Sequence, residues 1–566
     1  MITGNPPYSY LSRNNGAFIT QAIDDYRYTL DHPEGTQIKP DTSVLERQPL
    51  GERNPRALQD DYVKFVRFAQ IKMDAVEEGV VGVITNHSWL DNATLRGMRQ
   101  SLMRSFEQIY VLDLHGNAKK RERSPDGSKD ENVFDIEQGV AISVFVKRPG
   151  LERGIWRGDL WGKRLAKYEV VATSSLKDLR LSAVRSSRPD YLFVVRDAER
   201  EIEYDRGWSL SQVFAMKSVG IVTARDAFTL GRTAEEIWDR IQDVIKSNAD
   251  DVRSMFKLGK DTRDWTVAGA IADLSAEPLS RYRLKSVHYR PFDFRYTYVT
   301  GRSRGFLSYP RMSMWNQLGG RNLALISSRF TKGESFAHAL VTDTMIEKII
   351  LSPNTSNNGF LFPLLQSPEG ESENFSGHFR AFIDSRYEHH YAPEEIFGYI
   401  YAVLHAPTYR ARYAEFLRSD FPRLPFPEKA EDFETLSGLG WALVQAHLLR
   451  ELPLRGLAAH HGKGDHRVEA VRYSAEEQAI HINKSQCFKP VPSEVWDFHI
   501  GGYRVLDKYL NSRKGRVLSL DEINHLGAVA DSLAFTIEQM ARIDAVYRGA
   551  FKTVGKSNSA VASTGY

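Results

Sequence analysis

Residues 62–85 decide the fold of the first part of this chain, and they read Tyr-Val-Lys-Phe-Val-Arg-Phe-Ala-Gln-Ile-Lys-Met-Asp-Ala-Val-Glu-Glu-Gly-Val-Val-Gly-Val-Ile-Thr. Apolar side chains recur there at the spacing of one helix face. They are Tyr62, Phe65, Val66, Ala69, Met73 and Val76. Gly79 ends this predicted helix, and the apolar run 80–85 predicts a buried strand. A helix that leads into a buried strand is typical of an α/β sheet.

The same alternation continues toward the carboxyl end. Asp91 or Asn92 can cap a second helix, whose inward residues we expect to be Leu95, Met98, Leu102 and Phe106. Residues 109–114 and 139–146 predict two further strands, separated by a charged loop. Strands that alternate with helices predict a mostly parallel α/β sheet with helices on both faces. The last two strands have no helix between them, so we expect them to pair antiparallel.

Toward the amino end, residues 2–9 contain the turn-forming segment Asn5-Pro6-Pro7-Tyr8. A plain proline-rich turn is one interpretation, because Asn, Pro and Gly are ordinary turn residues. The other follows from a resemblance to the signature loop of enzymes that methylate exocyclic amines. Such an amine is a weak nucleophile, and two acceptors can hold its two hydrogens. The Asn5 side-chain oxygen can be one, and a backbone carbonyl of the Pro6-Pro7 unit, aimed by the fixed proline φ, the other. Tyr8 offers a flat face for a base rotated out of a duplex.

Composition limits the class of protein. The 566 residues are 42% hydrophobic and 26% charged, as in ordinary globular proteins, and the length predicts about two to four domains. Lys plus Arg (75) nearly balance Asp plus Glu (72), so nucleic-acid binding would need a local basic cleft. The single cysteine, Cys487, excludes a disulfide framework and a multi-cysteine zinc site. No secretory signal opens the chain and no apolar run reaches the roughly 18 residues of a membrane helix, so we expect a cytoplasmic protein without membrane contact.

Residues 289–298 read Tyr-Arg-Pro-Phe-Asp-Phe-Arg-Tyr-Thr-Tyr and mix arginines with aromatic residues. Alternation at Phe292, Phe294, Tyr296 and Tyr298 predicts a half-buried strand. Such a mixture suits contacts with phosphates and base edges; alternatively, the aromatics pack and the arginines extend along apolar surface. The candidate DNA-contacting residues are Arg290, Arg295, Arg302, Arg304 and Arg311, with Lys119, Lys120 and Arg121 of the charged loop. For that loop, solvated surface is the alternative.

The remaining segments predict helices and short strands. Helices are expected at 234–247, from Pro393 with Ile396, Ile400, Val403 and Leu404 inward, from a Thr408 cap through Leu417, and at 520–547. Ordered segments are expected at 208–214 and 220–226, a rigid connector at 421–426, a strand hairpin from 471–473 and 480–482, and a loose tail from 552.

Two other patterns are rejected as sites. Residues 549–557 resemble a phosphate-binding loop, but five residues separate the glycines instead of four and no predicted strand precedes them. His460, His461, Asp465 and His466 lie in a polar, glycine-containing segment, where solvated side chains are more common than metal ligands. We therefore predict no metal site.

Asn-Pro-Pro-Tyr resembles the signature loop of enzymes that methylate exocyclic amines, above all N6 of adenine in DNA. With the segments 61–68, 289–298, 400–410, 421–426 and 500–516, in this order, the chain resembles the C-terminal part of Type ISP restriction–modification enzymes and related adenine methyltransferases. The resemblance implies that Asn5, Pro6, Pro7 and Tyr8 form the adenine site, with S-adenosylmethionine as methyl donor and double-stranded DNA as substrate. It implies the second half of a class I (Rossmann-like) methyltransferase sheet, followed by a mixed α+β target-recognition domain with helical segments.

The expected domains are 1–150 (half of the methyltransferase), 151–275 (a connecting region), 276–550 (target recognition) and 551–566 (a flexible tail). The resembling enzymes bind the donor through a Gly-rich turn upstream of the loop, where this chain has only four residues. Neither Gly501-Gly502, which lacks the Gly-x-Gly spacing, nor Gly438-Leu439-Gly440, in a helical context, is assigned as a permuted donor turn.

We therefore expect the donor site to be mostly absent from this chain. An upstream polypeptide would supply it, and in the full enzymes a nuclease and an ATP-driven translocase also precede the methyltransferase. The alternatives are a non-catalytic DNA-binding specificity protein that needs a partner chain, and an inactive remnant of a split gene.

Overall fold

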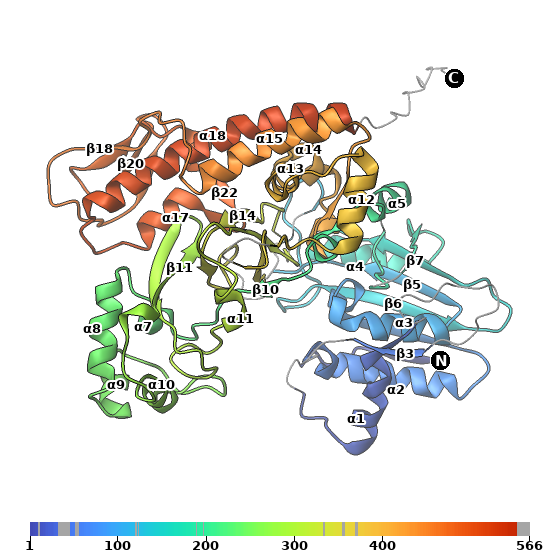
Figure 1. The fold of residues 1–566 in the computed structure, drawn as a ribbon. Helices are drawn as coiled ribbons and strands as arrows, with labels where there is room; N and C mark the ends of the chain where they lie inside the picture. The colour runs from blue at the N-terminus through green and yellow to red at the C-terminus, as the bar shows by residue number, and fades with distance from the viewer. Residues whose placement is uncertain are drawn as a thin grey trace. The chain divides into compact units, whose positions relative to one another are not determined.

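The computed structural model describes residues 1–9, 12–31, 46–50, 56–118, 122, 124–187, 190–195, 197–331, 334–353, 357–367 and 372–551. The chain forms two compact units, Met1–Glu201 and Ile202–Tyr566, and Figure 1 labels many of their elements. The predicted DNA-contacting residues Lys119, Lys120 and Arg121, and the tail from 552, lie outside the described residues.

A six-stranded sheet in the order β1-β4-β6-β5-β7-β8 forms the centre of the first unit. Its strands are β1 (Ile2–Gly4), β4 (Gly79–Asn86), β5 (Gln108–Asp113), β6 (Val140–Lys147), β7 (Gly154–Asp159) and β8 (Ser182–Ala183). β1 pairs in parallel with β4, and β5 with β7, whereas β6 runs antiparallel between β4 and β5. The three predicted strands are confirmed, as is the antiparallel pairing of the last two.

Helices α2 (Asp61–Asp74) and α3 (Arg96–Ser105) confirm the two helices predicted in this unit. Their apolar residues form a core with one face of the sheet, which presents Val81, Val83, Ile109, Val111 and Phe145. Successive strand residues point to opposite faces, so Leu112 and Val140 lie in a second, smaller cluster on the other face. The remaining elements of the unit are α1 (Ala17–Ile23), the paired strands β2 (Tyr28–Asp31) and β3 (Glu46–Pro49), α4 (Arg164–Thr173) and α5 (Ala198–Asp205), which continues past the boundary.

The buried face of α2 differs in part from the predicted one. Phe65 and Val76 are 46% and 44% exposed, whereas Lys64 and Arg67 are buried. The polar side chains are buried because the preceding segment supplies them with partners; Arg67 Nε, for example, donates to the Ala22 carbonyl at 3.0 Å. Residue periodicity detects the helix but not this polar contact, which depends on residues 45 positions apart.

The first unit continues past residue 150, where the sequence had suggested a domain boundary. β7 pairs in parallel with the free edge of β5, and β8 pairs antiparallel with β7, so both strands extend the same sheet. The boundary between the two units therefore lies at Glu201.

Several small sheets form the strand part of the second unit. One has the order β10-β16-β13-β14 and another the order β12-β11-β15. Their strands are β10 (Ser218–Val219), β11 (Leu284–Arg290), β12 (Asp293–Tyr298), β13 (Ala324–Ser328), β14 (Ala339–Thr342), β15 (Met345–Ile346) and β16 (Gly359–Pro363). A third sheet contains β18 (Ala459–His461), β19 (Arg472–Ser474), β20 (Ala479–His481) and β21 (Cys487–Lys489). Antiparallel β19 and β20 confirm the predicted hairpin.

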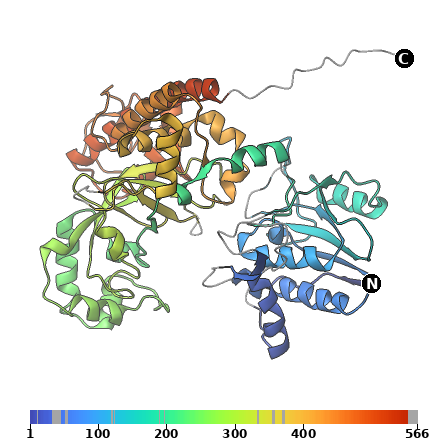
Figure 2. The ribbon, with the colours of Figure 1, turned by 45° about the vertical axis from the view of Figure 1, so that its right-hand side comes forward.

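Helices α13 (Pro393–His405), α15 (Ala430–His447) and α18 (Leu520–Ala550) pack together in this unit, with α18 alongside α15 (Figure 1, Figure 2). With α8 (Ala234–Val244), α13 and α18 confirm predicted helices. Glycines let α13 and α15 approach closely, because a Cβ on Gly440 would lie 1.9 Å from the Gly398 carbonyl oxygen. Gly440 thus contributes to helix packing.

The helix α14 (Pro407–Arg412) is shorter than predicted, and Ala406 is its N-terminal cap instead of Thr408. Thr408 has a tertiary partner: its backbone N–H and Oγ1 both lie within hydrogen-bond distance of the Asp544 carboxylate on α18, at 2.6 and 3.0 Å. The connector at 421–426 contains a short strand, β17 (Arg423–Leu424), which pairs with β9 (Trp208–Ser209).

Candidate functional site

The Asn5-Pro6-Pro7-Tyr8 segment directly follows β1, at the edge of the sheet where the parallel strands end. In α/β sheets, ligands bind outside these carboxyl ends because the loops there are free to vary while the strands hold them in place. Asn5 and Pro7 are exposed, Pro6 is buried and Tyr8 is half-buried. The segment therefore presents an amide and an aromatic ring from an anchored backbone.

Tyr8 joins this segment to the end of β4. Its hydroxyl lies 3.2 Å from Asn5 Oδ1 and 3.3 Å from the Ile84 carbonyl oxygen, and both oxygens are acceptors. The ring packs edge-on against Tyr62, with centroids 6.4 Å apart. Burial raises the pKa of Tyr8 to about 12, so the hydroxyl is neutral and donates at physiological pH.

The start of α2 holds the other side of the segment. Ser9 N donates to Asp60 Oδ1 at 3.0 Å, and Asp61 N donates to the Ser9 carbonyl at 3.3 Å. Burial raises the pKa of Asp60, although the N–H bond from Ser9 opposes this. Sequence reasoning missed this clamp; its signal was the acidic pair directly before a predicted helix.

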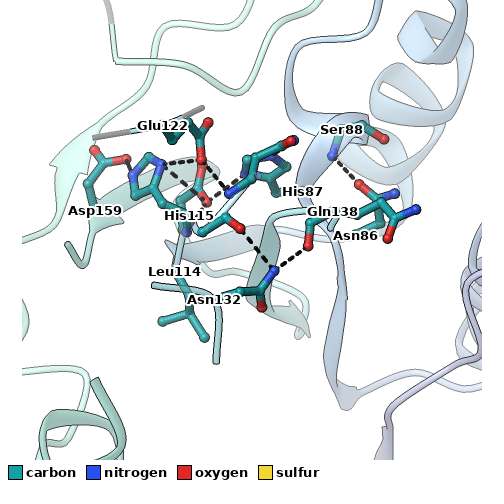
Figure 3. Close-up of polar contacts among 12 residues, drawn as sticks. Asn86, His87, Ser88, Leu114, His115, Glu122, Asn132, Gln138 and Asp159 are labelled. Atoms are coloured by element: carbon teal, nitrogen blue, oxygen red, sulfur yellow. Dashed lines mark hydrogen bonds and ion pairs between the residues drawn. The ribbon is translucent and has the colours of Figure 1, made fainter. Parts of the chain in front are cut away.

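Two histidines and an aspartate meet at the ends of β4 and β5; Figure 3 labels the two histidines, His87 and His115. His87 follows β4, Asp113 ends β5, and His115 lies two residues further on. His87 Nδ1 is 2.9 Å from Asp113 Oδ1, and His115 Nδ1 is 3.8 Å from the same oxygen. All three residues are buried. The predicted absence of a metal site had rested on Cys487 and on residues 460–466, and sequence reasoning missed this group because its members are separated by a helix and a strand.

Further polar groups surround this cluster. Arg157 Nη2 lies 2.7 Å from Asp113 Oδ2, and Asp159 Oδ1 lies 2.8 Å from His115 Nε2. Burial alone would raise the pKa of Asp113, but the hydrogen bond with His87 and the charge of Arg157 outweigh it and hold that pKa well below its usual range. The carboxylate is therefore ionised at physiological pH.

Arg290 and Arg295, predicted to contact DNA, are occupied inside the second unit. Arg290 Nη1 lies 2.7 Å from Glu347 and Arg295 Nη2 lies 2.6 Å from Asp293, and the two arginine side chains are 5% and 8% exposed. β12 confirms the predicted strand, but its buried face carries Asp293 and Arg295, while Phe294 is 38% exposed. The ion pairs offset the cost of burying these arginines. The alternation of aromatic residues alone therefore does not identify which face of β12 points outward.

Arg302 and Arg304 lie on the turn after β12 and are exposed. Arg304 is 61% exposed and its Nη2 lies 3.6 Å from Asp264, which also pairs with Arg263 at 2.7 Å. Arg311 is half-buried and has a left-handed backbone with φ of 61°. We call Arg263, Arg302 and Arg304 the exposed basic turn; sequence reasoning found two of its three members.

An α/β unit that presents a polar loop at its sheet edge, followed by a larger mixed unit, defines the class of this protein. The chain belongs to the Type ISP family, because the family described as the Type ISP C-terminal specificity domain matches residues 212–541. No curated protein matches the chain. In the part of the chain that the structure describes, the helices are too short or too polar to cross a membrane.

Three solved structures are similar to this fold over 96% of the chain. They are the DrdV–DNA complex (TM-score 0.68, 22% identity, 56% of that chain), a nuclease-deletion mutant of the Type ISP restriction–modification enzyme LlaGI in complex with a DNA substrate mimic (0.67, 20%, 44%) and the ATP-dependent Type ISP enzyme LlaBIII bound to DNA (0.68, 19%, 37%). The present chain thus spans between 37% and 56% of the chains it resembles.

Proposed function

We propose that this chain provides the adenine-binding side and the target-recognition part of a Type ISP-like DNA adenine-N6 methyltransferase. The observation that carries the proposal is the Asn5-Pro6-Pro7-Tyr8 segment directly after β1, in a sheet whose reversed strand β6 lies between β4 and β5. Both features are those expected of the second half of a class I methyltransferase.

In this proposal, the target amine replaces the Tyr8 hydroxyl as the donor to Asn5 Oδ1, which is 3.2 Å away in the free chain. A carbonyl of the Pro6-Pro7 unit, held by the fixed proline φ, accepts the second amine hydrogen. Two acceptors draw the nitrogen toward a geometry in which its lone pair is available for methyl transfer. Tyr8 is neutral and contributes its ring face to the rotated base. Positioning then supplies most of the rate enhancement.

The methyl donor in this proposal is S-adenosylmethionine, and the described residues do not by themselves fit it. β1 is the edge strand of the sheet, and no described strand flanks its other side. Ligands of such sheets lie between the loops of neighbouring strands, so this chain offers one flank of the site only. We propose that the donor is bound by polypeptide outside this chain, whether upstream in one protein or in a partner.

Double-stranded DNA is the proposed substrate. Support comes from the match of residues 212–541 to a specificity domain and from similar folds described in complex with DNA. The exposed basic turn offers guanidinium groups for phosphates, with Asp264 as a shared partner.

Replacement of Asn5 by alanine tests the catalytic proposal once the donor-binding half is supplied in cis or in trans. We expect a rate loss on the order of 10²–10³ with little change in DNA affinity, because the lost hydrogen bond forms at the reacting atom. Asn14→Ala is the matched control, since Asn14 is an exposed amide outside the Asn5-Pro6-Pro7-Tyr8 segment. Methylated sites are mapped by single-molecule sequencing. Full activity of the Asn5→Ala protein would remove the basis of the proposal.

A second candidate is a DNA-binding specificity protein without catalysis. The observation that favours it is the family match, which begins at residue 212 and leaves out the sheet of the first unit. In that case the supplemented wild-type chain would bind its DNA target but methylate no adenine.

A further inference from the structure

The buried cluster of His87, Asp113 and His115 has the chemical composition of a metal site. Two imidazole nitrogens and one carboxylate oxygen come together within 4.8 Å of one another. Imidazole and carboxylate are the ligands that zinc and similar divalent transition metals take in three-residue protein sites. A network of hydrogen bonds is the competing explanation. The two explanations differ in whether a buried ring nitrogen is left without a hydrogen-bond partner.

His115 Nδ1 is the atom that a hydrogen-bonded network leaves unexplained. Among the described residues it has no hydrogen-bond partner, although the His115 side chain is only 6% exposed. The carboxylate oxygens of Asp113 and Glu122 lie 3.8 Å and 3.9 Å from it, and Glu122 is seen beside the His115 ring in Figure 3. These distances are too long for hydrogen bonds, and they leave room for an ion beside His115 Nδ1.

The other nitrogen of His115 is held as a metal-ligating histidine requires. Nε2 lies 2.8 Å from Asp159 Oδ1, and the ring stacks on Trp161 with centroids 3.3 Å apart. A carboxylate on one ring nitrogen fixes the tautomer, so the lone pair of the other nitrogen points inward. Asp159 therefore stands as an outer partner that orients His115.

His87 is placed in the cluster by the backbone of the next strand. A Cβ on Gly139 would lie 2.4 Å from His87 Cε1, so glycine makes room for the ring. Asp113 binds Arg157 through Oδ2, which leaves Oδ1 directed at both histidines. The carboxylates of Asp113, Asp159 and Glu122 surround the rings. The charge of Arg157 alone does not balance these three negative charges, and a divalent cation would balance the remainder.

An entry path for an ion is also present. A cavity of about 980 Å³ is lined by Gly116, Asn117, Glu122 and residues 129–132 and 134–137. Glu122 thus lines the cavity and also faces His115. Asn117, also at its wall, lies 3.1 Å from His87 Nε2.

We propose that His87, Asp113 and His115 bind one divalent transition-metal ion, with zinc as the best-suited metal. The ion would tie the loop after β5 to the end of β4, the strand whose Ile84 carbonyl anchors Tyr8. This inference concerns the first unit alone and does not depend on the proposed methyltransferase activity.

The test uses the full chain, stripped with a chelator and titrated with Zn²⁺ alone by calorimetry. We expect one equivalent to bind and X-ray absorption of the zinc-loaded chain to show two imidazole ligands and no sulfur, which excludes Cys487. Asp159→Asn should weaken binding about 10–100-fold, and His115→Gln should abolish it. His466→Gln, in the other histidine-rich segment, is the matched control and should bind zinc as the wild type does.

Three results would overturn the proposal. They are no stoichiometric binding by the wild-type chain, a zinc spectrum with sulfur or fewer than two imidazoles, and loss of binding in His466→Gln with retention in His115→Gln. If His115→Gln does not fold, the wild-type spectrum and the Asp159→Asn titration decide the question.

Discussion

The buried ion pair between Lys167 and Asp130 provides the sharpest test of how the first unit holds its loops. Both side chains are fully buried, and Lys167 Nζ lies 2.7 Å from Asp130 Oδ1. The same ammonium donates to the carbonyls of Leu114 and Glu131, each at 2.7 Å. Asp130 in turn accepts from Gly116 N at 2.7 Å. The pair therefore fixes the loop that carries His115.

Lys167→Met keeps most of the side-chain volume and removes the charge. It leaves the Asp130 carboxylate and two carbonyls buried without their donor, and breaking a buried pair in this way costs about 3–5 kcal/mol. For a unit that ends at Glu201, each kcal/mol lowers the melting temperature by about 2–4 °C, so we expect a decrease of about 6–20 °C in the first unit's transition. Calorimetry, with hydrogen exchange at residues 114–131 to assign the transition, measures it.

Two further variants separate this explanation from a general loss of packing. Lys129→Met removes a lysine that is 83% exposed and 3.4 Å from Glu131, and it should cost less than about 1 kcal/mol. Lys167→Met combined with Asp130→Asn should recover part of the loss, because no unpaired charge remains. A Lys167→Met protein as stable as Lys129→Met would refute the reasoning.

Four other predictions follow from the site and the second unit. Tyr8→Phe loses the bonds to Asn5 Oδ1 and the Ile84 carbonyl but keeps the ring face, so in the supplemented enzyme its methylation rate should lie above that of Tyr8→Ala, which in turn should exceed that of Asn5→Ala. The double variant Arg302→Ala, Arg304→Ala should weaken duplex DNA binding and reduce the slope of log affinity against log salt concentration by about one per lost phosphate contact. Arg472→Ala, which changes an exposed arginine on β19, should do neither. Fluorescence anisotropy at several salt concentrations measures both effects, and a double variant that binds DNA as well as Arg472→Ala does would place the DNA-binding surface elsewhere. Calorimetry should detect no micromolar binding of S-adenosylmethionine to the chain alone, and such binding would place the donor site within it. Burial would raise the pKa of Asp293, but the charges of Arg513 and Arg295 hold it below its usual value. The stability that this carboxylate contributes is therefore present above the ordinary Asp pKa of about 3.9 and lost as the pH falls below it. The advantage of wild type over Asp293→Asn in urea unfolding should therefore shrink as the pH is lowered below about 4, and a constant difference would contradict the assignment.

Local sequence patterns predicted the elements that have strong periodicity. α2, α3 and α18 confirm predicted helices, and β19 and β20 confirm the hairpin. These elements could be predicted because their signal comes from neighbouring residues. The start of α14 could not be predicted, because Thr408 contacts Asp544, which lies 136 positions away in the sequence.

The candidate site shows the same division. The Asn5-Pro6-Pro7-Tyr8 segment could be recognised because proline restricts its backbone locally. Its anchoring by Ile84 and Asp60 could not be predicted, since both residues reach it through the sheet and through α2.

By itself, the sequence predicted an α/β sheet and showed the Asn5-Pro6-Pro7-Tyr8 turn and an arginine-rich segment. Only the tertiary structure decided which charged residues are internal. Arg295 and Arg302 look alike in the sequence, yet one pairs with buried Asp293 and the other is exposed. Only the tertiary structure brought His87, Asp113 and His115 together. The physical reason is that a buried charge needs a partner, and in this fold the partners come from distant parts of the chain; Arg513 reaches Asp293 across 220 positions.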